Sequence, residues 1–237
     1  MTATVCIPWR PSESRMKPYE RVRRFWAERF PDWPVIAEDS DTEIFSASRA
    51  RNNAVRKAAT EIVVVADADT IPEADNVVRA VADPAGVTYP FTTWRLIPAE
   101  YADRPLEEFP RIPALIDPHA TGGVMVTTTD EYWRLGGQPE EFHGWGYEDQ
   151  AFKYVAQALS EWRRIPGAAY SIDHQADSPA WTRDITRNAG LVRPYRIAAD
   201  KPQLMREIVD TPYERRKYVQ LPEADPLIGR YLGRGYW

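Results

Sequence analysis

Apolar positions along the chain follow two periods, one typical of strands and one typical of helices. Glu61–Ala66 holds four consecutive β-branched apolar residues, which predicts a strand buried on both faces of a sheet. In Tyr19–Arg29, Val22, Phe25 and Trp26 share one helical face, and most charged residues lie on another. Strands and helices alternate in this way, which predicts an α/β fold with a largely parallel central sheet. The expected strands are Thr2–Ile7, Val35–Ala37, Glu61–Ala66, Gly86–Tyr89, Gly122–Thr129 and one or two strands within Trp162–Ile172. The expected helices are Tyr19–Arg29, Ser48–Ala59, Glu73–Ala82, Asp130–Leu135, Tyr147–Leu159 and one helix after about Lys201.

Two stretches lack this regularity. Pro90–Ala120 is rich in proline and has little periodicity, so it is expected to be a long functional loop. The end of the chain, after its last helix, is punctuated by proline, arginine and tyrosine. We therefore expect one domain over residues 1–200, with a helix and tail over residues 201–237 that pack on it or trail from it.

Composition excludes several classes of protein. The chain has 237 residues, 43% hydrophobic and 27% charged, which excludes wholesale disorder. Its 30 basic and 35 acidic residues give a net charge of −5, a poor basis for binding nucleic acid, although a local basic cleft stays possible. The single cysteine, Cys6, excludes a disulfide framework and a multi-thiolate metal site. No apolar run is long enough to span a membrane or to serve as a signal peptide, so we expect a soluble, cytoplasmic protein.

Asp67-Ala68-Asp69 follows the most buried strand. In open α/β sheets the ligand crevice lies beyond the carboxyl ends of the strands, and alternate residues of an extended segment face the same way. The two carboxylates are therefore expected to converge on one cation, although a simple acidic turn would have the same sequence. An aspartate-nucleophile phosphatase motif would need Thr or Val at Ile71, so that alternative is weaker.

Gly144-Trp145-Gly146-Tyr147-Glu148-Asp149 is the second candidate motif. The glycines allow a sharp turn that holds an indole against a sugar ring, and the two acids can bind hydroxyl groups. Acids in the first turn of a helix are also favoured by the helix dipole alone, but the dipole does not require Gly-Trp-Gly.

These motifs, in their order along residues 2–175, resemble the GT-A fold glycosyltransferases. The C-terminal part, with Thr121-Gly122-Gly123 and Gly136-Gly137, is similar to the β-galactosyltransferase and polypeptide N-acetylgalactosaminyltransferase families. The segment Ser48–Ala54 resembles the A-R-N-x-G segment of family-two glycosyltransferases. The resemblance implies a GT-A (Rossmann-like) fold and transfer of a hexose or N-acetylhexosamine from a nucleotide-diphosphate sugar, usually a UDP-sugar, with Mn²⁺ or Mg²⁺.

The resemblance also implies roles for single residues. Asp149 would be the catalytic base of an inverting displacement, and Glu148 would bind sugar hydroxyls; Gln150 departs from the galactosyltransferase pattern and leaves the acceptor class open. Asp69, Asp67 and His174 would hold the metal, although without the resemblance His174 is better explained as a surface or capping residue. Nucleotide binding would involve Pro8, Trp9, Arg10, Asp39, Arg49 or Arg51, and Asp67; sugar or acceptor binding would involve Gly122, Gly123, Trp145, Gly146 and Glu148.

Alternatives remain at this stage. Arg51 and Asn52 could be solvated or capping helix residues. The chain could be a non-catalytic nucleotide-sugar or carbohydrate-binding protein of the same fold, or a nucleotidyltransferase, although Pro8–Ser12 lacks the glycines of such a loop. The acceptor could be a glycan, a protein hydroxyl or a modified nucleobase.

Overall fold

The computed structural model describes residues 1–144, 146–174, 181–213 and 215. Its main sheet has the strand order β2-β1-β3-β8-β5-β9. Five of these strands run in one direction; β8 is antiparallel to both of its neighbours. The mostly parallel central sheet predicted from the sequence is therefore confirmed, with β8 as its exception. The strands of this sheet are β1 (Ala3–Pro8), β2 (Val35–Glu38), β3 (Ile62–Ala66), β5 (Val87–Tyr89), β8 (Val124–Thr128) and β9 (Trp162–Arg164).

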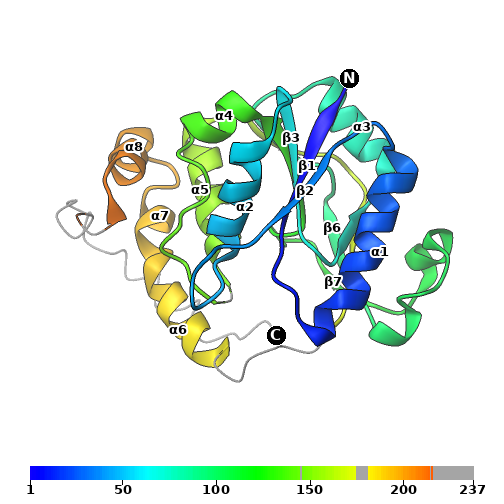
Figure 1. Cartoon of the computed structure of the whole chain (residues 1–237). Helices are drawn as coiled ribbons and strands as arrows, with labels where there is room; N and C mark the ends of the chain where they lie inside the picture. Colours follow the sequence, from blue (N-terminus) through cyan, green and yellow to red (C-terminus); the bar gives the residue numbers. More distant parts are fainter. Residues whose placement is uncertain (145, 175–180, 214, 216–237) are drawn as a thin grey trace.

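Helices cover both faces of the main sheet (Figure 1). Val63 and Val65 of β3 pack in a core with α2, α4 and α5, whereas Ile62 and Val64 pack in a second core with α1 and α3. This alternation explains why the strand is apolar at every position. The helices are α1 (Glu13–Arg29), α2 (Ala47–Lys57), α3 (Ala74–Ala82), α4 (Thr129–Arg134), α5 (Glu148–Leu159), α6 (Trp181–Leu191), α7 (Arg193–Ile197) and α8 (Pro202–Asp210).

A second sheet of four strands, in the order β4-β10-β6-β7, corrects the expectation of a long loop over Pro90–Ala120. That segment contains β6 (Thr93–Ile97), two short 3₁₀ helices and β7 (Leu115–Asp117). The prediction was wrong there because these strands are short and half-exposed, so they carry no clear alternation. The other two strands are β4 (Thr70–Pro72), which is antiparallel to β10, and β10 (Ala168–Ile172), which is parallel to β6.

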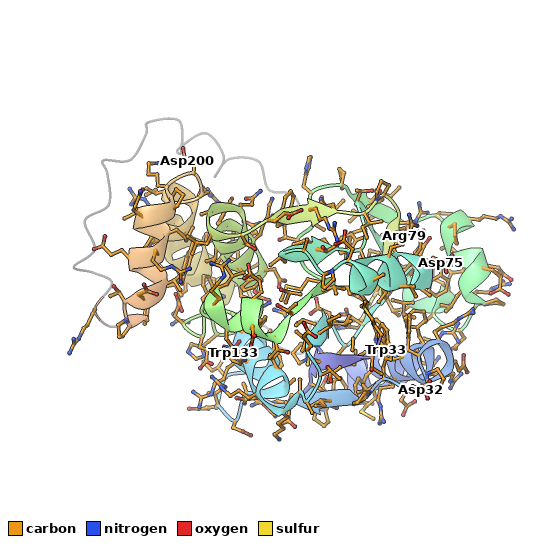
Figure 2. The ribbon with its side chains drawn as sticks, turned by 90° about the horizontal axis from the view of Figure 1, so that it is seen from above. Asp32, Trp33, Asp75, Arg79, Trp133 and Asp200 are labelled. Atoms are coloured by element: carbon orange, nitrogen blue, oxygen red, sulfur yellow. The ribbon has the colours of Figure 1, made fainter. Side chains whose placement is uncertain are left out.

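The last described helices form one end of the molecule. Asp200, between α7 and α8, lies at the opposite end from Asp75 and Arg79 of α3 (Figure 2). Met205 and Ile208 of α8 are buried in the core that α5 shares. In the described part of the chain, every helix is too short or too polar to cross a membrane. The tail expected after this helix lies outside the described residues, apart from its first few positions.

Candidate functional site

The site forms where β3 ends and β8 begins. Because β8 is antiparallel to β3, its first residues lie at the edge where the parallel strands end. The backbone N–H of Asp67 donates to Gly123 O at 2.7 Å, and Gly123 N–H donates to the Asp67 carboxylate (Oδ2) at 3.0 Å. The first acid of Asp67-Ala68-Asp69 and the Gly122-Gly123 pair are thus directly hydrogen-bonded to each other.

Arg51 of α2 connects these residues to the second acidic motif. Its guanidinium lies 2.5 Å from Asp67 Oδ1, 2.9 Å from Asp149 Oδ1 and 3.4 Å from Glu148 Oε1. Its side chain is only 4% exposed, and Gln138 Oε1 accepts a further hydrogen bond from it at 2.8 Å. Three carboxylates from two separate motifs therefore surround one buried cation.

Burial changes the acid–base properties of this cluster. Burial alone lowers the pKa of Arg51, but Asp149, Asp67 and Glu148 outweigh it and raise that pKa well above its ordinary value. Burial also raises the pKa of Asp149 well above its ordinary range, with Arg51 opposing the shift and neighbouring carboxylates adding to it. Arg51 stays charged, and Asp149 holds a proton more strongly than an exposed aspartate does.

Gly122 is the contact point between the two motifs. A Cβ placed on it would lie 2.6 Å from Asp149 Oδ2 and 3.6 Å from Asp67 Oδ2. The Asp149 carboxylate therefore occupies a place that a side chain at position 122 would fill, and Asp67 lies in ordinary contact distance of the same place.

The chain before α5 has an unusual backbone. Gly144, Gly146 and Tyr147 have φ values of 71°, 97° and 73°, all in the left-handed region. Tyr147 is the N-cap residue of α5, and Glu148 and Asp149 follow at once in the first turn. Backbone strain of this kind often accompanies functional sites. Trp145, expected to contact a sugar, lies outside the described residues.

Asp69 and His174 meet through the second sheet. The antiparallel pairing of β4 with β10 places the residues that flank these strands side by side, and Ile172 N–H donates to Asp69 O at 2.9 Å. His174 Nε2 lies 3.1 Å from Asp69 Oδ2, and Thr70 and Ser171 donate their hydroxyls to Asp69 Oδ1. Burial would raise the pKa of Asp69, but the hydrogen bond and charge of His174 outweigh it, so that this pKa is lowered. The pair offers an imidazole nitrogen and a carboxylate oxygen at one place.

Asp67 does not join that pair. The chain turns after β3, with Thr70 N–H donating to Asp67 O, so the alternation of an extended segment does not apply. The Asp67 carboxylate is bonded to Arg51 and to Gly123 N–H instead. Among the described residues, no three His, Cys, Asp or Glu side chains gather closely enough to hold a metal ion. This differs from the expected set of Asp67, Asp69 and His174.

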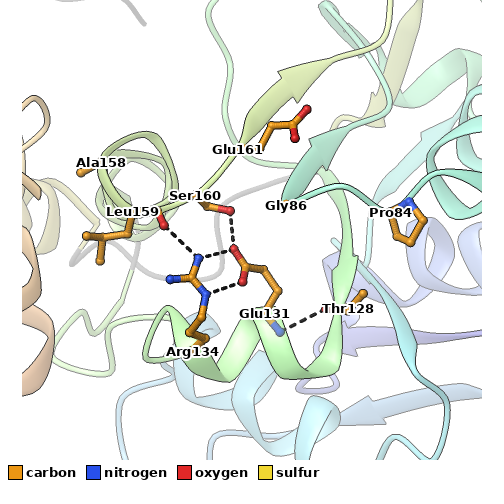
Figure 3. Close-up of a pocket in the computed structure, with 9 residues that line it drawn as sticks. All are labelled: Pro84, Gly86, Thr128, Glu131, Arg134, Ala158, Leu159, Ser160 and Glu161. Atoms are coloured by element: carbon orange, nitrogen blue, oxygen red, sulfur yellow. Dashed lines mark hydrogen bonds and ion pairs between the residues drawn. The ribbon is translucent and has the colours of Figure 1, made fainter.

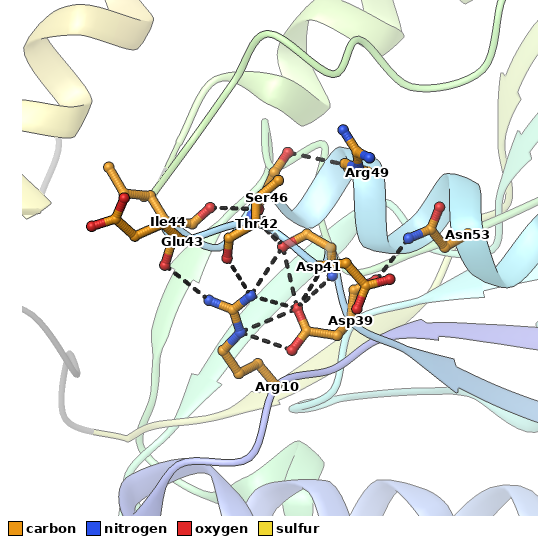
Figure 4. A network of polar contacts seen from close by, with 10 residues as sticks. Arg10, Asp39, Asp41, Thr42, Glu43, Ile44, Ser46, Arg49 and Asn53 are labelled. Carbon is orange, nitrogen blue, oxygen red and sulfur yellow. Dashed lines mark hydrogen bonds and ion pairs between the residues drawn. The ribbon is translucent and has the colours of Figure 1, made fainter.

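Two of the residues expected to bind nucleotide, Arg51 and Asp67, belong to the acidic cluster. Arg10 and Asp39 form another cluster, between β1 and the β2–α2 connection (Figure 4). Arg10 donates two hydrogen bonds to the Asp39 carboxylate, at 2.8 and 2.7 Å, and also bonds the carbonyls of Thr42 and Glu43. Hydrogen bonding from Arg10 lowers the pKa of Asp39. Trp9, next to the strand-ending Pro8, stacks on Tyr19 with ring centroids 3.8 Å apart. Arg49 is exposed on the first turn of α2.

A cavity of about 520 Å³ lies away from these clusters (Figure 3). It is found where β5 begins and β8 ends, at the opposite edge of the main sheet. Its charged groups already pair with each other: Arg134 donates to Glu131, which also accepts from the Ser160 hydroxyl. The chemistry of the acidic clusters, and not the size of this cavity, therefore identifies the candidate site.

Two site residues were missed by sequence reasoning. Gln138, which bonds Arg51, follows the Gly136-Gly137 pair, so its position next to a recognised motif was a usable signal. Asn188 of α6 bonds the backbone before α5, and no feature of the sequence around it indicates that contact.

Comparisons with known proteins agree with the fold. A family model described as the N-terminal domain of galactosyltransferase matches residues 115–174. Staphylococcus aureus TarS, residues 1–349 in complex with UDP-GlcNAc, is 14% identical over 88% of this chain and 70% of that chain, with a TM-score of 0.56. The crystal structure titled simply S. aureus TarS is 15% identical over all of this chain and 46% of that chain, with a TM-score of 0.53. A Drosophila β1,4-galactosyltransferase 7 complex with manganese, UDP-Gal and xylobiose is 13% identical over 77% of this chain and 73% of that chain, with a TM-score of 0.49.

Curated protein sequences give no match to the chain. The chain spans less than half of the longer TarS structure. At these low identities the likeness concerns the architecture, and it confirms the architecture expected from the sequence. The chain has the fold of the GT-A glycosyltransferases.

Proposed function

We propose that this chain is a metal-dependent glycosyltransferase that moves a hexose or N-acetylhexosamine from a UDP-sugar to an acceptor hydroxyl, with inversion. The observation that carries the proposal is the gathering of Asp67, Glu148 and Asp149 around the buried Arg51. Asp69, which pairs with His174, is close enough to this group to act on Asp149 electrostatically. One edge of the fold thus brings a carboxylate–imidazole pair near a second group of carboxylates, which supports the proposal of a cation site beside a base.

On the donor side, Asp69 and His174 are the residues that would hold Mn²⁺ or Mg²⁺. A carboxylate oxygen and an imidazole nitrogen suit Mn²⁺, and two protein ligands leave room for diphosphate oxygens and water. When bound, such an ion stabilises the negative charge on the departing diphosphate. Arg10, Asp39 and the surrounding loop would then form the nucleotide end of the site.

On the acceptor side, Asp149 is the base. The acceptor oxygen forms its bond to the anomeric carbon as the bond from that carbon to the diphosphate breaks, and the hydroxyl proton passes to Asp149. Burial raises the pKa of Asp149, which makes it a stronger base than an exposed aspartate. Glu148 binds sugar hydroxyls. A single in-line displacement of this kind inverts the anomeric centre.

Two comparisons support this proposal. The TarS structure that shares the fold was solved with UDP-GlcNAc. The residues matched by the galactosyltransferase model include Gly122, Glu148, Asp149 and His174.

The test is a screen of UDP-sugars that measures released UDP with Mn²⁺ and with a chelator. We expect slow hydrolysis of one UDP-sugar that requires the metal and is lost in Asp69→Asn. Asp130→Asn changes an exposed aspartate of α4 and is the matched control, expected to behave as the wild type. Equal turnover in chelator contradicts the metal role, and binding of donors without turnover under any condition favours a binding protein of the same fold.

A further inference from the structure

Asn188 of α6 makes a contact that none of the proposed roles includes. Its side chain is completely buried. Its amide nitrogen donates to His143 O at 3.1 Å and to Gly146 O at 3.0 Å. An asparagine amide has two N–H groups on one nitrogen, so it can serve two carbonyls at once. These two carbonyls lie on either side of the sharp turn that leads into α5.

That turn needs support because of its backbone. Gly144, Gly146 and Tyr147 all have left-handed φ values, and Tyr147 is not a glycine. Glycine adopts such values freely, but a residue such as Tyr147 persists there only where its surroundings fix it. Glu148 and Asp149 follow directly, so any relaxation of the turn moves both carboxylates.

The segment is also held by Phe45 and Ser46, the residues that lead into α2. The Ser46 hydroxyl donates to Phe142 O at 2.7 Å, and Gly144 N–H donates to Phe45 O at 2.8 Å. The same helix carries Arg51, five residues after Ser46. These two bonds therefore tie the turn to the start of the helix that carries Arg51.

Helix α6 adds further contacts to this segment. Asn188 supplies two hydrogen bonds, Arg187 donates to Glu141 O at 3.3 Å, and Ile185 packs near Gly146. Of the three residues, Asn188 alone is fully buried and bonds the turn at two points.

We propose that Asn188 is a positioning residue for glycosyl transfer: it ties the carbonyls of His143 and Gly146 to α6 and so keeps Glu148 and Asp149 directed at Arg51 and Gly122. This inference rests on the proposed glycosyltransferase function. It predicts that removing the amide lowers the rate of the reaction more than it weakens binding of the donor.

The test uses the full chain, Mn²⁺ and the UDP-sugar that the wild type hydrolyses, with water as acceptor. In Asn188→Ala, we expect kcat to fall roughly 10- to 100-fold, because small displacements of catalytic groups have effects of that size, while the donor KM stays unchanged. Asn188→Gln keeps the amide and is expected to recover part of the lost rate.

Asn76→Ala is the matched control. Asn76 is also completely buried on a helix, and its amide donates to a loop carbonyl, Pro166 O, at 3.0 Å. Its side-chain partners are Glu73, Arg79 and Pro166, which lie outside the acidic cluster, so its loss should lower the unfolding temperature and leave kcat unchanged. A kcat in Asn188→Ala equal to that of Asn76→Ala would overturn the proposal, because stability alone would then explain both.

Hydrogen exchange gives a readout that does not depend on turnover. We expect the backbone amides of residues 146–150 to exchange faster in Asn188→Ala than in the wild type, and to be unchanged in Asn76→Ala. Unchanged exchange there would overturn the positioning role even if the rate fell. A wild type that turns over no UDP-sugar would refute the proposed function and the catalytic part of this inference with it, whereas an active wild type with a fully active Asn188→Ala would refute this inference alone.

Discussion

Replacing Arg51 with methionine tests how much of the acidic cluster depends on one guanidinium. Arg51→Met keeps an unbranched, apolar side chain of similar length and removes the charge. In the wild type, Arg51 is 4% exposed, and its three carboxylate partners, Asp67, Glu148 and Asp149, are 12–25% exposed. The variant therefore leaves three largely buried carboxylates close together without their cation.

The expected cost follows from the burial of these pairs. Removing one partner of a buried ion pair costs about 3–5 kcal/mol, because the other partner is left uncompensated. Three carboxylates share this cation, but Asp149, whose pKa burial already raises, can take up a proton, which limits the cost, so we expect a loss in that same range at pH 7. For a chain of this size the loss corresponds to an unfolding temperature lower by roughly 6–20 °C.

The pH dependence has a definite sign. Burial raises the pKa of Asp149 and Arg51 opposes that shift, so without Arg51 this pKa rises further and the folded chain binds more protons than the unfolded chain. Stability of the variant therefore increases as the pH falls from 7 towards the ordinary carboxylate range. The deficit relative to the wild type should be smaller at pH 5 than at pH 7.

Urea unfolding followed by tryptophan fluorescence, at pH 7 and pH 5, measures this deficit. Arg56→Met is the matched control on the same helix, since Arg56 is 51% exposed and pairs with Glu140 at 3.1 Å. An exposed pair contributes about 0–1 kcal/mol. An Arg51→Met deficit no larger than that of the control, or one that does not shrink at pH 5, would refute the reasoning.

Two further predictions concern the groups next to Arg51. Gly122→Ala places a Cβ 2.6 Å from Asp149 Oδ2, so we expect a stability loss of about 1–3 kcal/mol and a marked loss of UDP-sugar turnover. Gly190→Ala, in helix α6 with open space around its Cβ, should leave turnover unchanged and should not lower the stability. Thermal unfolding and UDP release measure both variants, and an active, stable Gly122→Ala would contradict the geometry. Because burial raises the pKa of Asp149, kcat/KM should fall on acidification at a pH above the ordinary aspartate value of 3.8; a limb at or below that value would exclude Asp149 as the base.

The sequence pattern was sufficient to predict those elements and motifs whose own residues show a clear periodicity or spacing. Ile62–Ala66 has an apolar residue at every position, and it is buried on both faces. The D-x-D and Gly-Trp-Gly-x-Glu-Asp motifs were recognisable because acids, glycines and aromatics stand at fixed spacings within a few residues. The alternation of strands and helices was enough to predict the α/β class. The resemblance of these motifs to known glycosyltransferases added the prediction of a GT-A fold.

The second sheet was not predictable in this way. β7 has three residues and β6 is half-exposed, so neither shows an alternation that distinguishes it from a loop. Both exist because β6 pairs with β10, more than 70 residues further along the chain. The free energy of this strand pairing comes from contacts between residues far apart in the sequence, so a short stretch of sequence does not reveal it.

By itself, the sequence determined the main alternation of strands and helices, and it indicated which acidic residues are candidates for the functional site. Only the tertiary structure decided which partner each acid has: Asp67 pairs with Arg51, and Asp69 pairs with His174. The physical reason is that a buried guanidinium is stable only where several carboxylates converge on it, and that convergence requires α2, β3 and α5 to be packed together. A residue such as Arg51, which looks like an ordinary charged position on a helix, acquires its role from partners 16 to 98 positions away.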